Sequence, residues 1–351
     1  MDVLVEKIKK KMLEGIKEKV FPGAVYAIIY KEKILTIEAV GNKSLYPKKE
    51  VNTIDTIYDL ASFTKVIVTN TLISKLYEEK RINLMDKVKK YIPEFKHDDI
   101  TIFDLLTHSS GLPAFVNWEG IKTKEEYINL IFKVDKEVFR HTKVIYSDIG
   151  FILLGILIEK VTGETLDELA QKEIFEKLGM DNTMFNPIDK KRCAPTEKEG
   201  DIYIKGVVHD KKARLFNGVA GHAGLFSTIF DVMNFALMVK NDGKFGGKQF
   251  ISKKIIDLWY KPFFKDDDGR FRTLGGWLYG PTSQVCDKIS KKALFQQGFT
   301  GSRMIIDKEN DLIIIMLTNR VHPTRENKKL GPFWKNFATF VYHELIAEKV
   351  K

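Results

Sequence analysis

Residues 58–70 read YDLASFTKVIVTN, and they mark the point at which the hydrophobic pattern of the chain changes. Upstream, residues 23–31 (GAVYAIIYK) and 34–41 (ILTIEAVG) have the composition of two strands joined by a tight turn. Downstream, apolar residues recur at the spacing of a helix. Ser62 and Lys65 stand at the start of that helix, among positions where an amphipathic helix would carry aliphatic side chains. The stretch therefore predicts a junction between a strand pair and a helix, with a hydroxyl and an amine placed together.

The order of the expected elements predicts an α+β fold. Along the rest of the chain the sequence predicts helices up to about Lys177, a loop-rich section over 180–224, a helix over 227–242, strands over 274–280, 293–307 and 312–319, and a terminal helix over 333–350. Strands from both chain ends, with helices between them, are typical of an antiparallel sheet flanked by helices and carrying a helical insertion. We therefore expect a sheet subdomain formed by residues 1–70 and 205–351, a mostly helical subdomain formed by residues 71–204, and an active site between them.

The charge pattern argues against a nucleic-acid partner. Lys and Arg number 57 and Asp and Glu number 47, which gives a formal net charge of +10. The lysines are interleaved with acidic residues, as in residues 75–90 and 209–214, and no basic block alternates with aromatic side chains. Such a pattern is typical of a solvated surface.

The N-terminal residues predict a surface helix. Apolar residues between Val3 and Ile16 lie on one helical stripe, and no apolar core is followed by a small-residue cleavage site. No stretch approaches the roughly 20 apolar residues that span a bilayer. Cys193 and Cys286 lie far apart without His or Cys neighbours at ligand spacing. We therefore expect a cytoplasmic protein with reduced thiols and no stable membrane insertion.

Ser62 and Lys65 have the spacing of a proton-transfer pair. In a helix, residues three apart share a face, so the two side chains can touch. A hydroxyl at a helix N-terminus lies at the positive end of the dipole, which favours its alkoxide. A neighbouring amine could take the proton and leave an activated nucleophile for acyl transfer. The alternative is an N-cap serine beside a lysine whose side chain extends to solvent.

Two later stretches add context to this pair. Tyr146 and Asp148 stand just before a strongly apolar helix, for which Asp148 could also be the N-cap. Gly298 and Gly301 fall within the strand pattern of residues 293–307, where glycine weakens a strand unless something must approach the backbone closely. A substrate that pairs along the strand would be such a reason.

Together, SFTK (62–65), YSD (146–148) and QQG (296–298) resemble the elements of the serine β-lactamase and penicillin-binding-protein superfamily, in which S-x-x-K precedes S-D-N and K-T-G. Their order and spacing are similar to those of the branch that contains class C β-lactamases, D-alanyl-D-alanine carboxypeptidases and related esterases, where Y-x-N replaces S-D-N. The resemblance runs from about Phe21 to Asn319, and it implies the β-lactamase/transpeptidase fold.

The resemblance also implies a role for each matching residue. Ser62 would be the nucleophile that forms an acyl-enzyme, and Lys65 would be its proton acceptor or electrostatic partner. Tyr146 would pass the proton to the leaving group and help to activate water for deacylation. The backbone N–H groups of Ser62 and Phe299 would form the oxyanion hole, which stabilises the transition state by several kcal/mol.

Asp148 and Gln296 depart from the family pattern. Asp148 stands where the family typically has Asn, and an ionised Asp accepts hydrogen bonds but cannot donate one to a substrate carbonyl. Its charge should favour the ammonium form of Lys65, which shifts the role of base toward Tyr146. Gln296 stands where the family has Lys or His, and a neutral amide attracts a substrate carboxylate less than a cation does.

The resemblance places further residues along the substrate cleft. The expected substrate-binding residues are Asp148, Gln296, Gln297, Gly298 and His222. Arg303, Arg320 or Arg325 would either compensate for the missing cation or lie on the exposed surface, which is the commoner case for arginine. A lone histidine such as His222 is more often structural than catalytic.

The departures favour esters over peptides. β-Lactams and D-Ala-D-Ala peptides present both an acylamide and a carboxylate, whereas simple esters need neither recognition group. We therefore expect a serine hydrolase, most similar to a carboxylesterase-like acyl hydrolase, that acts on a small-molecule ester or amide. One alternative is a D-amino-acid peptidase, D,D-carboxypeptidase or β-lactamase, and another is a non-catalytic penicillin-binding or sensor protein. The sequence implies no metal or organic cofactor and leaves the oligomeric state open.

Overall fold

The structure of the chain is a computed structural model that describes residues 2–280 and 285–346. Its largest feature is a nine-stranded antiparallel sheet. In spatial order its strands are β11 (Phe264–Lys265), β12 (Phe271–Arg272), β13 (Trp277–Leu278), β14 (Ala293–Gln297), β15 (Arg303–Asp307), β16 (Leu312–Thr318), β1 (Gly23–Tyr30), β2 (Lys33–Ser44) and β3 (Glu50–Val51). β16 pairs with β1 from Ala24↔Thr318 to Tyr30↔Leu312, which joins the two ends of the chain. The predicted α+β fold is confirmed.

Three smaller sheets lie outside the main one. They are β4 (Tyr58–Asp59) with β8 (Leu225–Ser227) and β5 (Met184–Phe185), β6 (Lys198–Glu199) with β7 (Ile202–Tyr203), and β9 (Lys244–Phe245) with β10 (Lys248–Gln249). β4 leads directly into the segment that carries Ser62.

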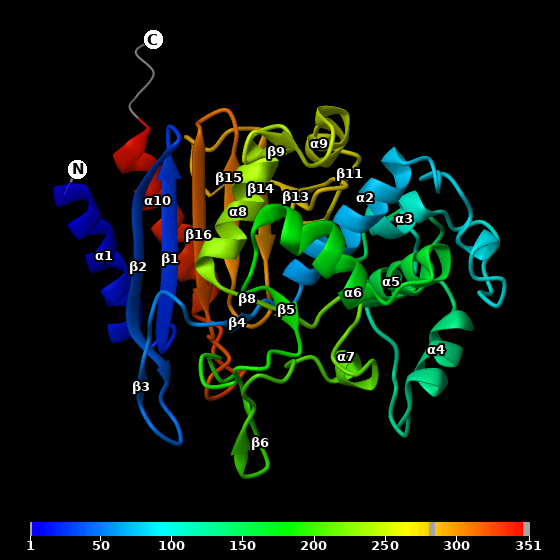
Figure 1. Cartoon of the computed structure of the whole chain (residues 1–351), viewed down its shortest axis with the longest axis horizontal. Helices are drawn as coiled ribbons and strands as arrows, with labels where there is room; N and C mark the ends of the chain where they lie inside the picture. Colours follow the sequence, from blue (N-terminus) through cyan, green and yellow to red (C-terminus); the bar gives the residue numbers. More distant parts are fainter. Residues whose placement is uncertain (1, 281–284, 347–351) are drawn as a thin grey trace.

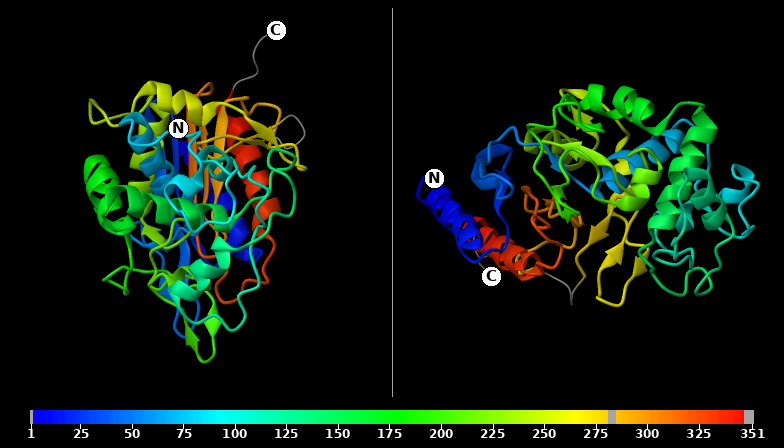
Figure 2. Two further views of the ribbon diagram at one scale, coloured as in Figure 1. Left: turned by 90° about the vertical axis from the view of Figure 1, so that its right-hand side faces the viewer. Right: turned by 90° about the horizontal axis from the view of Figure 1, so that it is seen from below.

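Helices cover both faces of the main sheet and form the part of the molecule beside it. They are α1 (Asp2–Lys17), η1 (Lys65–Asn70), α2 (Thr71–Glu78), η2 (Val88–Lys90), α3 (Ile102–Leu106), α4 (Lys124–Phe132), α5 (Asp148–Thr162), α6 (Leu166–Ala170), η3 (Gln171–Phe175), η4 (Glu176–Leu178), α7 (Lys211–Leu215), α8 (Ile229–Lys240), α9 (Lys253–Tyr260) and α10 (Leu330–Leu345). α1 and α10 lie side by side on one face of the sheet, and α8 covers the other (Figures 1 and 2). α2, α3, α4 and α5 lie together beyond the sheet (Figure 1).

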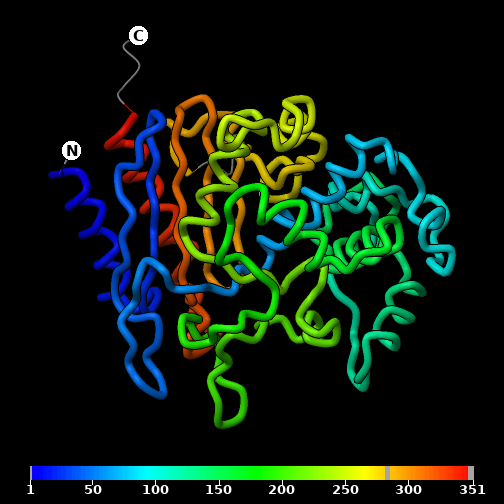
Figure 3. Tube along the Cα trace, viewed as in Figure 1, coloured from blue at the N-terminus to red at the C-terminus, as the bar shows by residue number. Residues whose placement is uncertain are grey.

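The strands read as continuous apolar runs because both faces of the sheet are buried. In β1, Val25 and Ala27 face the larger core, which also contains residues of α8 and the helical part. Tyr26 and Ile28 face the smaller core, which contains residues of α1 and α10. Figure 3 shows the same order in the trace, with the first strands lying beside the last ones. No helix among residues 2–280 and 285–346 is long and apolar enough to cross a membrane.

The strand pattern over 293–307 is a hairpin and not a single strand. β14 ends at Gln297 and β15 begins at Arg303, and the N–H of Gly298 donates to the oxygen of Ser302 at 2.9 Å to close the turn. Gly301 adopts a φ of +142°, which an L-residue with a side chain rarely takes. The glycines therefore belong to a turn, which the apolar pattern on both sides concealed.

Two expectations at the ends of helices differ in detail. α8 begins at Ile229, two residues later than the pattern predicted, with Thr228 as its N-cap residue. α10 begins at Leu330, three residues earlier than the pattern predicted, and residues 347–350 of that prediction lie outside the described residues.

Candidate active site

Ser62 lies in a tight turn between β4 and the helix that follows it. β4 ends at Asp59, Ala61 adopts a φ of +47°, and helical backbone begins at Phe63. A left-handed conformation of a residue with a side chain costs about 1–3 kcal/mol and persists only where the surrounding structure imposes it. The turn places Ser62 at the N-terminal end of the helix and on the wall of a cavity.

The Lys65 side chain is buried, with only 1% of it exposed. Its ammonium group donates to Ser62 Oγ at 3.1 Å. It also donates to Asp148 Oδ1 at 2.8 Å and to the backbone oxygen of His222 at 3.1 Å. The alternative of a lysine that extends to solvent is therefore wrong, because all three N–H donors have partners inside the protein.

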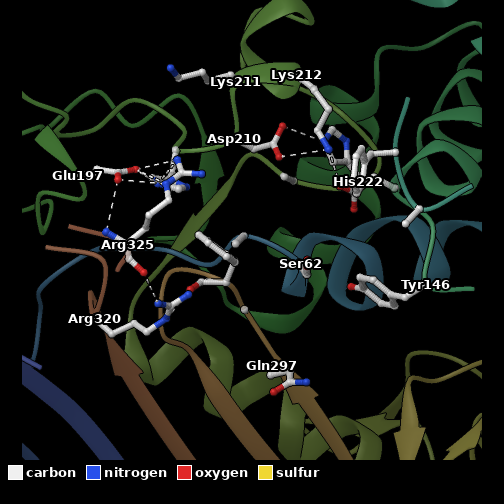
Figure 4. Close-up of a pocket in the computed structure, with 18 of the residues that line it drawn as sticks. Ser62, Tyr146, Glu197, Asp210, Lys211, Lys212, His222, Gln297, Arg320 and Arg325 are labelled. Atoms are coloured by element: carbon white, nitrogen blue, oxygen red, sulfur yellow. Dashed lines mark hydrogen bonds and ion pairs between the residues drawn. The ribbon is translucent and has the colours of Figure 1, made fainter. Parts of the chain in front are cut away.

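Tyr146 lines the same cavity, from the segment that precedes α5. Figure 4 shows its hydroxyl oxygen pointing toward Ser62. The Lys65 nitrogen lies 4.9 Å from the centre of the Tyr146 ring. On its other side the ring packs against His108 and Trp277, with ring centres 4.5 and 6.2 Å away. The structure thus brings together the three side chains that the sequence singled out.

Asp148 is not the N-cap of α5. Ser147 has that position, and its hydroxyl oxygen accepts the N–H of Gly150 at 3.3 Å. The Asp148 carboxylate instead lies between two ammonium groups. Oδ1 accepts from Lys65 at 2.8 Å and Oδ2 accepts from Lys212 at 2.6 Å.

Ion pairing outweighs burial throughout this cluster. Burial lowers the pKa of Lys65, but Asp148 and Tyr146 raise it more, so that the net shift of this pKa is upward. Burial raises the pKa of Asp148, but Lys65, His222 and Lys212 bring it below its usual value. The pKa of Lys212 is raised in the same way by Asp148, against the effect of burial. Lys65 is therefore an ammonium and Asp148 a carboxylate at neutral pH, as the charge argument predicted.

Lys212 and Asp210 belong to this cluster, although the charge pattern assigned residues 209–214 to a solvated surface. The Lys212 side chain is only 14% exposed and lies 3.7 Å from Asp210 Oδ2. Asp210 caps α7 by accepting the N–H of Ala213 at 2.9 Å, and this fixes its carboxylate. In the sequence, Asp210 was recognisable only as a residue type that caps helices, which does not show where the side chain of Lys212 lies.

His222 closes the cluster into a ring. Its Nε2 lies 3.1 Å from Asp210 Oδ1, and its backbone oxygen accepts from Lys65, so contacts lead from Lys65 through Asp148, Lys212, Asp210 and His222 back to Lys65. Figure 4 shows the part of this ring formed by Asp210, Lys212 and His222. The ligand atoms of Asp148, Asp210 and His222 lie within 4.8 Å of one another, a spacing that could hold a metal ion. The two lysines already supply positive charge to these carboxylates, so the donor set does not fit a metal cation.

Ser62 and Phe299 both line the cavity, and within the described ranges the N–H of neither donates a hydrogen bond. The peptide before each residue is held through its carbonyl. Ala61 O accepts the Thr64 hydroxyl at 2.7 Å, and Gly298 O accepts from Arg303 at 3.0 Å. Because the N–H of a trans peptide points away from its C=O, these bonds fix the directions of the two free donors.

The QQG element (296–298) contacts the turn that carries Ser62. The Gln296 side-chain amide is buried and donates to the backbone oxygen of Ser62 at 3.0 Å. Gln297 is exposed and points into the cavity region (Figure 4). A Cβ on Gly298 would lie 2.5 Å from the backbone oxygen of Leu60. The close backbone approach at this glycine is therefore to the turn that carries Ser62.

Three of the arginines that line the cavity lie at the end beside Gly298 and Phe299, and they are Arg303, Arg320 and Arg325. Arg325 pairs with Glu197 at 2.7 Å (Figure 4). Arg320 is buried, and its Nε donates to the oxygen of Phe299 at 3.0 Å. Burial and the charge of Arg320 lower the pKa of Arg303 to about 10, and no carboxylate among the described residues acts on that pKa. This end of the cavity therefore carries an excess of positive charge.

The cavity has a volume of about 970 Å³ and a partly aromatic rim. Phe115 is 71% exposed at its edge, and Trp118 and Phe299 also line it. A cavity of this size accommodates a small organic molecule. Its apolar rim and its charged floor suit a substrate with an apolar part and a polar reacting group.

Comparison with known proteins identifies the family. The beta-lactamase family model matches residues 8–338. The chain belongs to the beta-lactamase family. The N-acetylmuramyl-L-alanine amidase of Bacillus subtilis (strain 168) is 31% identical over 349 residues, covering 86% of this chain and 78% of that protein. A putative D-alanyl-D-alanine carboxypeptidase of Salmonella agona (strain SL483) is 32% identical over 319 residues, covering 80% of this chain and 73% of that protein.

The fold of this beta-lactamase family member also matches a solved structure. EstCE1, described as a hydrolase with promiscuous acyltransferase activity, superposes with a TM-score of 0.78 at 18% identity, covering 95% of this chain and 98% of the other. At that identity the likeness concerns the fold alone. The resemblance inferred from the three motifs is confirmed, and the chain has the fold of a family of serine hydrolases.

Proposed function

We propose that this protein is an acyl hydrolase that forms an acyl-enzyme on Ser62. The observation that carries the proposal is the hydrogen bond of 3.1 Å from the buried Lys65 ammonium to Ser62 Oγ, beside a cavity lined by Ser62 and Phe299, whose backbone N–H groups donate to no acceptor among the described residues. A nucleophile, a partner for its proton and an oxyanion hole are the parts that acyl transfer requires.

In the first step, Ser62 Oγ attacks the substrate carbonyl carbon, and the Ser62 proton passes to the Tyr146 oxygen while the Tyr146 hydroxyl proton moves toward the leaving oxygen. The Lys65 ammonium stabilises the negative charge that develops on Oγ and on the Tyr146 oxygen. The N–H groups of Ser62 and Phe299 bind the oxyanion. Tyr146 then gives the proton to the leaving oxygen as the acyl–oxygen bond breaks. Water repeats the sequence in reverse and releases the acid.

Esters are the substrate class that the floor of the cavity favours. Asp148 is ionised and held by Lys65 and Lys212, so it offers no N–H to a substrate acylamide. Gln296 is occupied by the backbone of Ser62 and offers no cation. The aromatic rim around Phe115 suits an apolar acyl or alcohol group. A carboxylesterase-like activity therefore fits this site best, because it requires neither an N–H donor for an acylamide nor a cation for a carboxylate.

A second candidate is hydrolysis of peptide amides that end in a carboxylate. Arg303 lines the cavity, and no carboxylate among the described residues acts on its pKa, so a substrate carboxylate would balance its charge. The names of the amidase and the putative carboxypeptidase that resemble this chain also favour it. A chromogenic cephalosporin or a D-Ala-D-Ala peptide turned over faster than every ester would favour this candidate.

Hydrolysis of p-nitrophenyl acetate tests the proposal. The wild type should release p-nitrophenol, and Ser62→Ala should reduce the rate to background. Ser252→Ala is the matched control, because Ser252 is a serine at a helix N-terminus outside the cavity. Turnover that survives in Ser62→Ala would refute the assignment. Stoichiometric acylation without turnover would instead indicate the non-catalytic sensor.

A further inference from the structure

Asp59 is a buried carboxylate at the end of β4, just before the Ser62 turn, and only 3% of the residue is exposed. One of its carboxylate oxygens accepts the N–H of Ala61 at 2.8 Å, and the other accepts the N–H of His209 at 2.7 Å. Its backbone oxygen accepts the hydroxyl of Thr300 at 2.6 Å. The side chain of Asp59 thus binds the turn that follows it and the segment at His209, and its backbone oxygen binds the segment at Thr300.

The ionised form of Asp59 suits these contacts. Each carboxylate oxygen faces an N–H donor, and a protonated carboxyl would place its O–H against one of them. Burial raises the pKa of Asp59, and the two backbone N–H groups lower it in part, so that the net shift of this pKa is upward. His209 and Asp210 are the titratable groups that act on Asp59 from the neighbouring loop. β8 and the turn after β14 present no titratable side chain to it.

The segments held in this way are those that carry the candidate oxyanion hole. Ala61 directly precedes Ser62, and Thr300 directly follows Phe299. The ring of His209 stacks on the ring of Phe299, with centres 5.6 Å apart and an interplanar angle of 24°. The carboxylate therefore fixes the first N–H group through the Ser62 turn. Its bond to His209, together with the bond from Thr300 to the backbone oxygen of Asp59, fixes the second.

We propose that Asp59 is the positioning residue of the oxyanion hole, holding the N–H groups of Ser62 and Phe299 at the spacing that the oxyanion requires. The proposal rests on the proposed function of Ser62. Asp59 does not touch the reacting atoms, because its contacts run through the backbone of Ala61 and through Thr300 and His209. Its loss should therefore lower kcat and leave KM nearly unchanged.

The role predicts opposite effects of pH on activity and stability. As pH falls through the raised pKa of Asp59, the carboxylate takes up a proton, loses one N–H contact, and kcat falls. A carboxyl group whose pKa is higher in the folded state than in the unfolded state contributes more stability as pH falls through that pKa. The Asp59 contribution to stability therefore rises while activity declines. A purely structural role of Asp59 would not make activity and stability change in opposite directions with pH.

The test compares wild type, Asp59→Asn and Asp231→Asn, with kcat and KM for p-nitrophenyl acetate from pH 4 to 8. Asp231 is a matched control, because it is also buried with a raised pKa and accepts from Asn182 and Thr183, but these contacts do not lead to the segments that carry Ser62 and Phe299. We expect Asp59→Asn to lower kcat at pH 7 by about 30- to 100-fold with KM within about threefold, and to remove the acidic decline. Asp231→Asn should keep kcat within about threefold of wild type.

Thr300→Val is a second variant, which removes only the hydroxyl that binds the Asp59 oxygen. We expect kcat to fall about three- to tenfold, because one hydrogen bond is lost. The fall of kcat toward acid pH should occur at the same pH as in the wild type. Wild-type kcat in both Asp59→Asn and Thr300→Val would overturn the proposal, as would equal loss in Asp59→Asn and Asp231→Asn. A fluorophosphonate adduct on wild-type Ser62 separates these outcomes from failure of the proposed function, which would show no adduct.

Discussion

The cluster of Lys65, Asp148 and Lys212 predicts a specific pattern of stability changes. Asp148→Asn removes the carboxylate that both ammonium groups face and leaves Lys65 buried without a counter-ion. Removing one partner of a buried ion pair costs about 3–5 kcal/mol in the free energy of unfolding. Because 24% of the Asp148 side chain is exposed, we expect the low end of this range, about 3 kcal/mol.

A double-mutant cycle with Lys212→Met tests the coupling. Lys212→Met should cost about 2 kcal/mol, because Asp148 keeps Lys65 as a partner and only one charged hydrogen bond is lost. The double variant should lose about 1–2 kcal/mol less than the sum of the single variants. Urea unfolding at pH 7 measures all four free energies. Asp257→Asn is the control, because its ion pair with Lys253 is exposed to solvent and should contribute little to the free energy of unfolding.

The contribution of Asp148 to stability should decrease toward acid pH. Pairing lowers the pKa of Asp148 in the folded state, so its contribution is complete above the unfolded pKa of about 3.9 and is lost as pH falls through the lower folded value. The difference in stability between wild type and Asp148→Asn should be constant from about pH 5 to 8 and shrink by about 1 kcal/mol between about pH 4 and 3. A cost of Asp148→Asn equal to that of Asp257→Asn, or a difference that grows toward acid pH, would refute the reasoning.

Three predictions concern activity. Lys65→Ala should lower kcat for p-nitrophenyl acetate by about 10³-fold, and a loss below tenfold would show that Lys65 is not a partner of the Ser62 proton. Asp148→Asn should raise amide or β-lactam turnover relative to ester turnover, because it restores an N–H donor, and an unchanged ratio would contradict the charge argument. Gly298→Ala places a Cβ 2.5 Å from the Leu60 oxygen and should lower kcat by about 10²-fold through displacement of the Ser62 turn, so wild-type kinetics would show that this approach is not needed.

The sequence was sufficient for the fold and for the centre of the candidate site. Apolar runs at both chain ends, with helices between them, predicted the sheet, because hydrophobic periodicity reports burial directly. Ser62 and Lys65 stood out because a hydroxyl and an amine are unusual where an amphipathic helix carries aliphatic side chains, and Tyr146 was found through the resemblance of YSD (146–148) to a family motif. Lys65 in particular lies at a position that would otherwise carry an aliphatic side chain, and the structure buries it there.

Residues that depend on tertiary contacts were missed for physical reasons. Lys212 looked like part of a solvated charge pattern, because a charged residue type does not show in which direction its side chain points. Its burial comes from pairing with Asp148, 64 residues earlier. Asp59 was missed because, apart from the N–H of Ala61 two residues on, its contacts lie 150 and 241 residues away. The turn at Gly298 was concealed because the apolar residues on both sides continue the strand pattern.

The central claim is that Ser62 is a nucleophile activated by Lys65, and covalent labelling tests it most directly. The protein is incubated with a fluorophosphonate, digested, and the peptides are analysed by mass spectrometry. We predict one phosphonyl adduct, on Ser62, which is absent from Ser62→Ala and formed at least tenfold more slowly in Lys65→Ala. An intact protein without an adduct on Ser62, or labelling at the wild-type rate in Lys65→Ala, would contradict the claim.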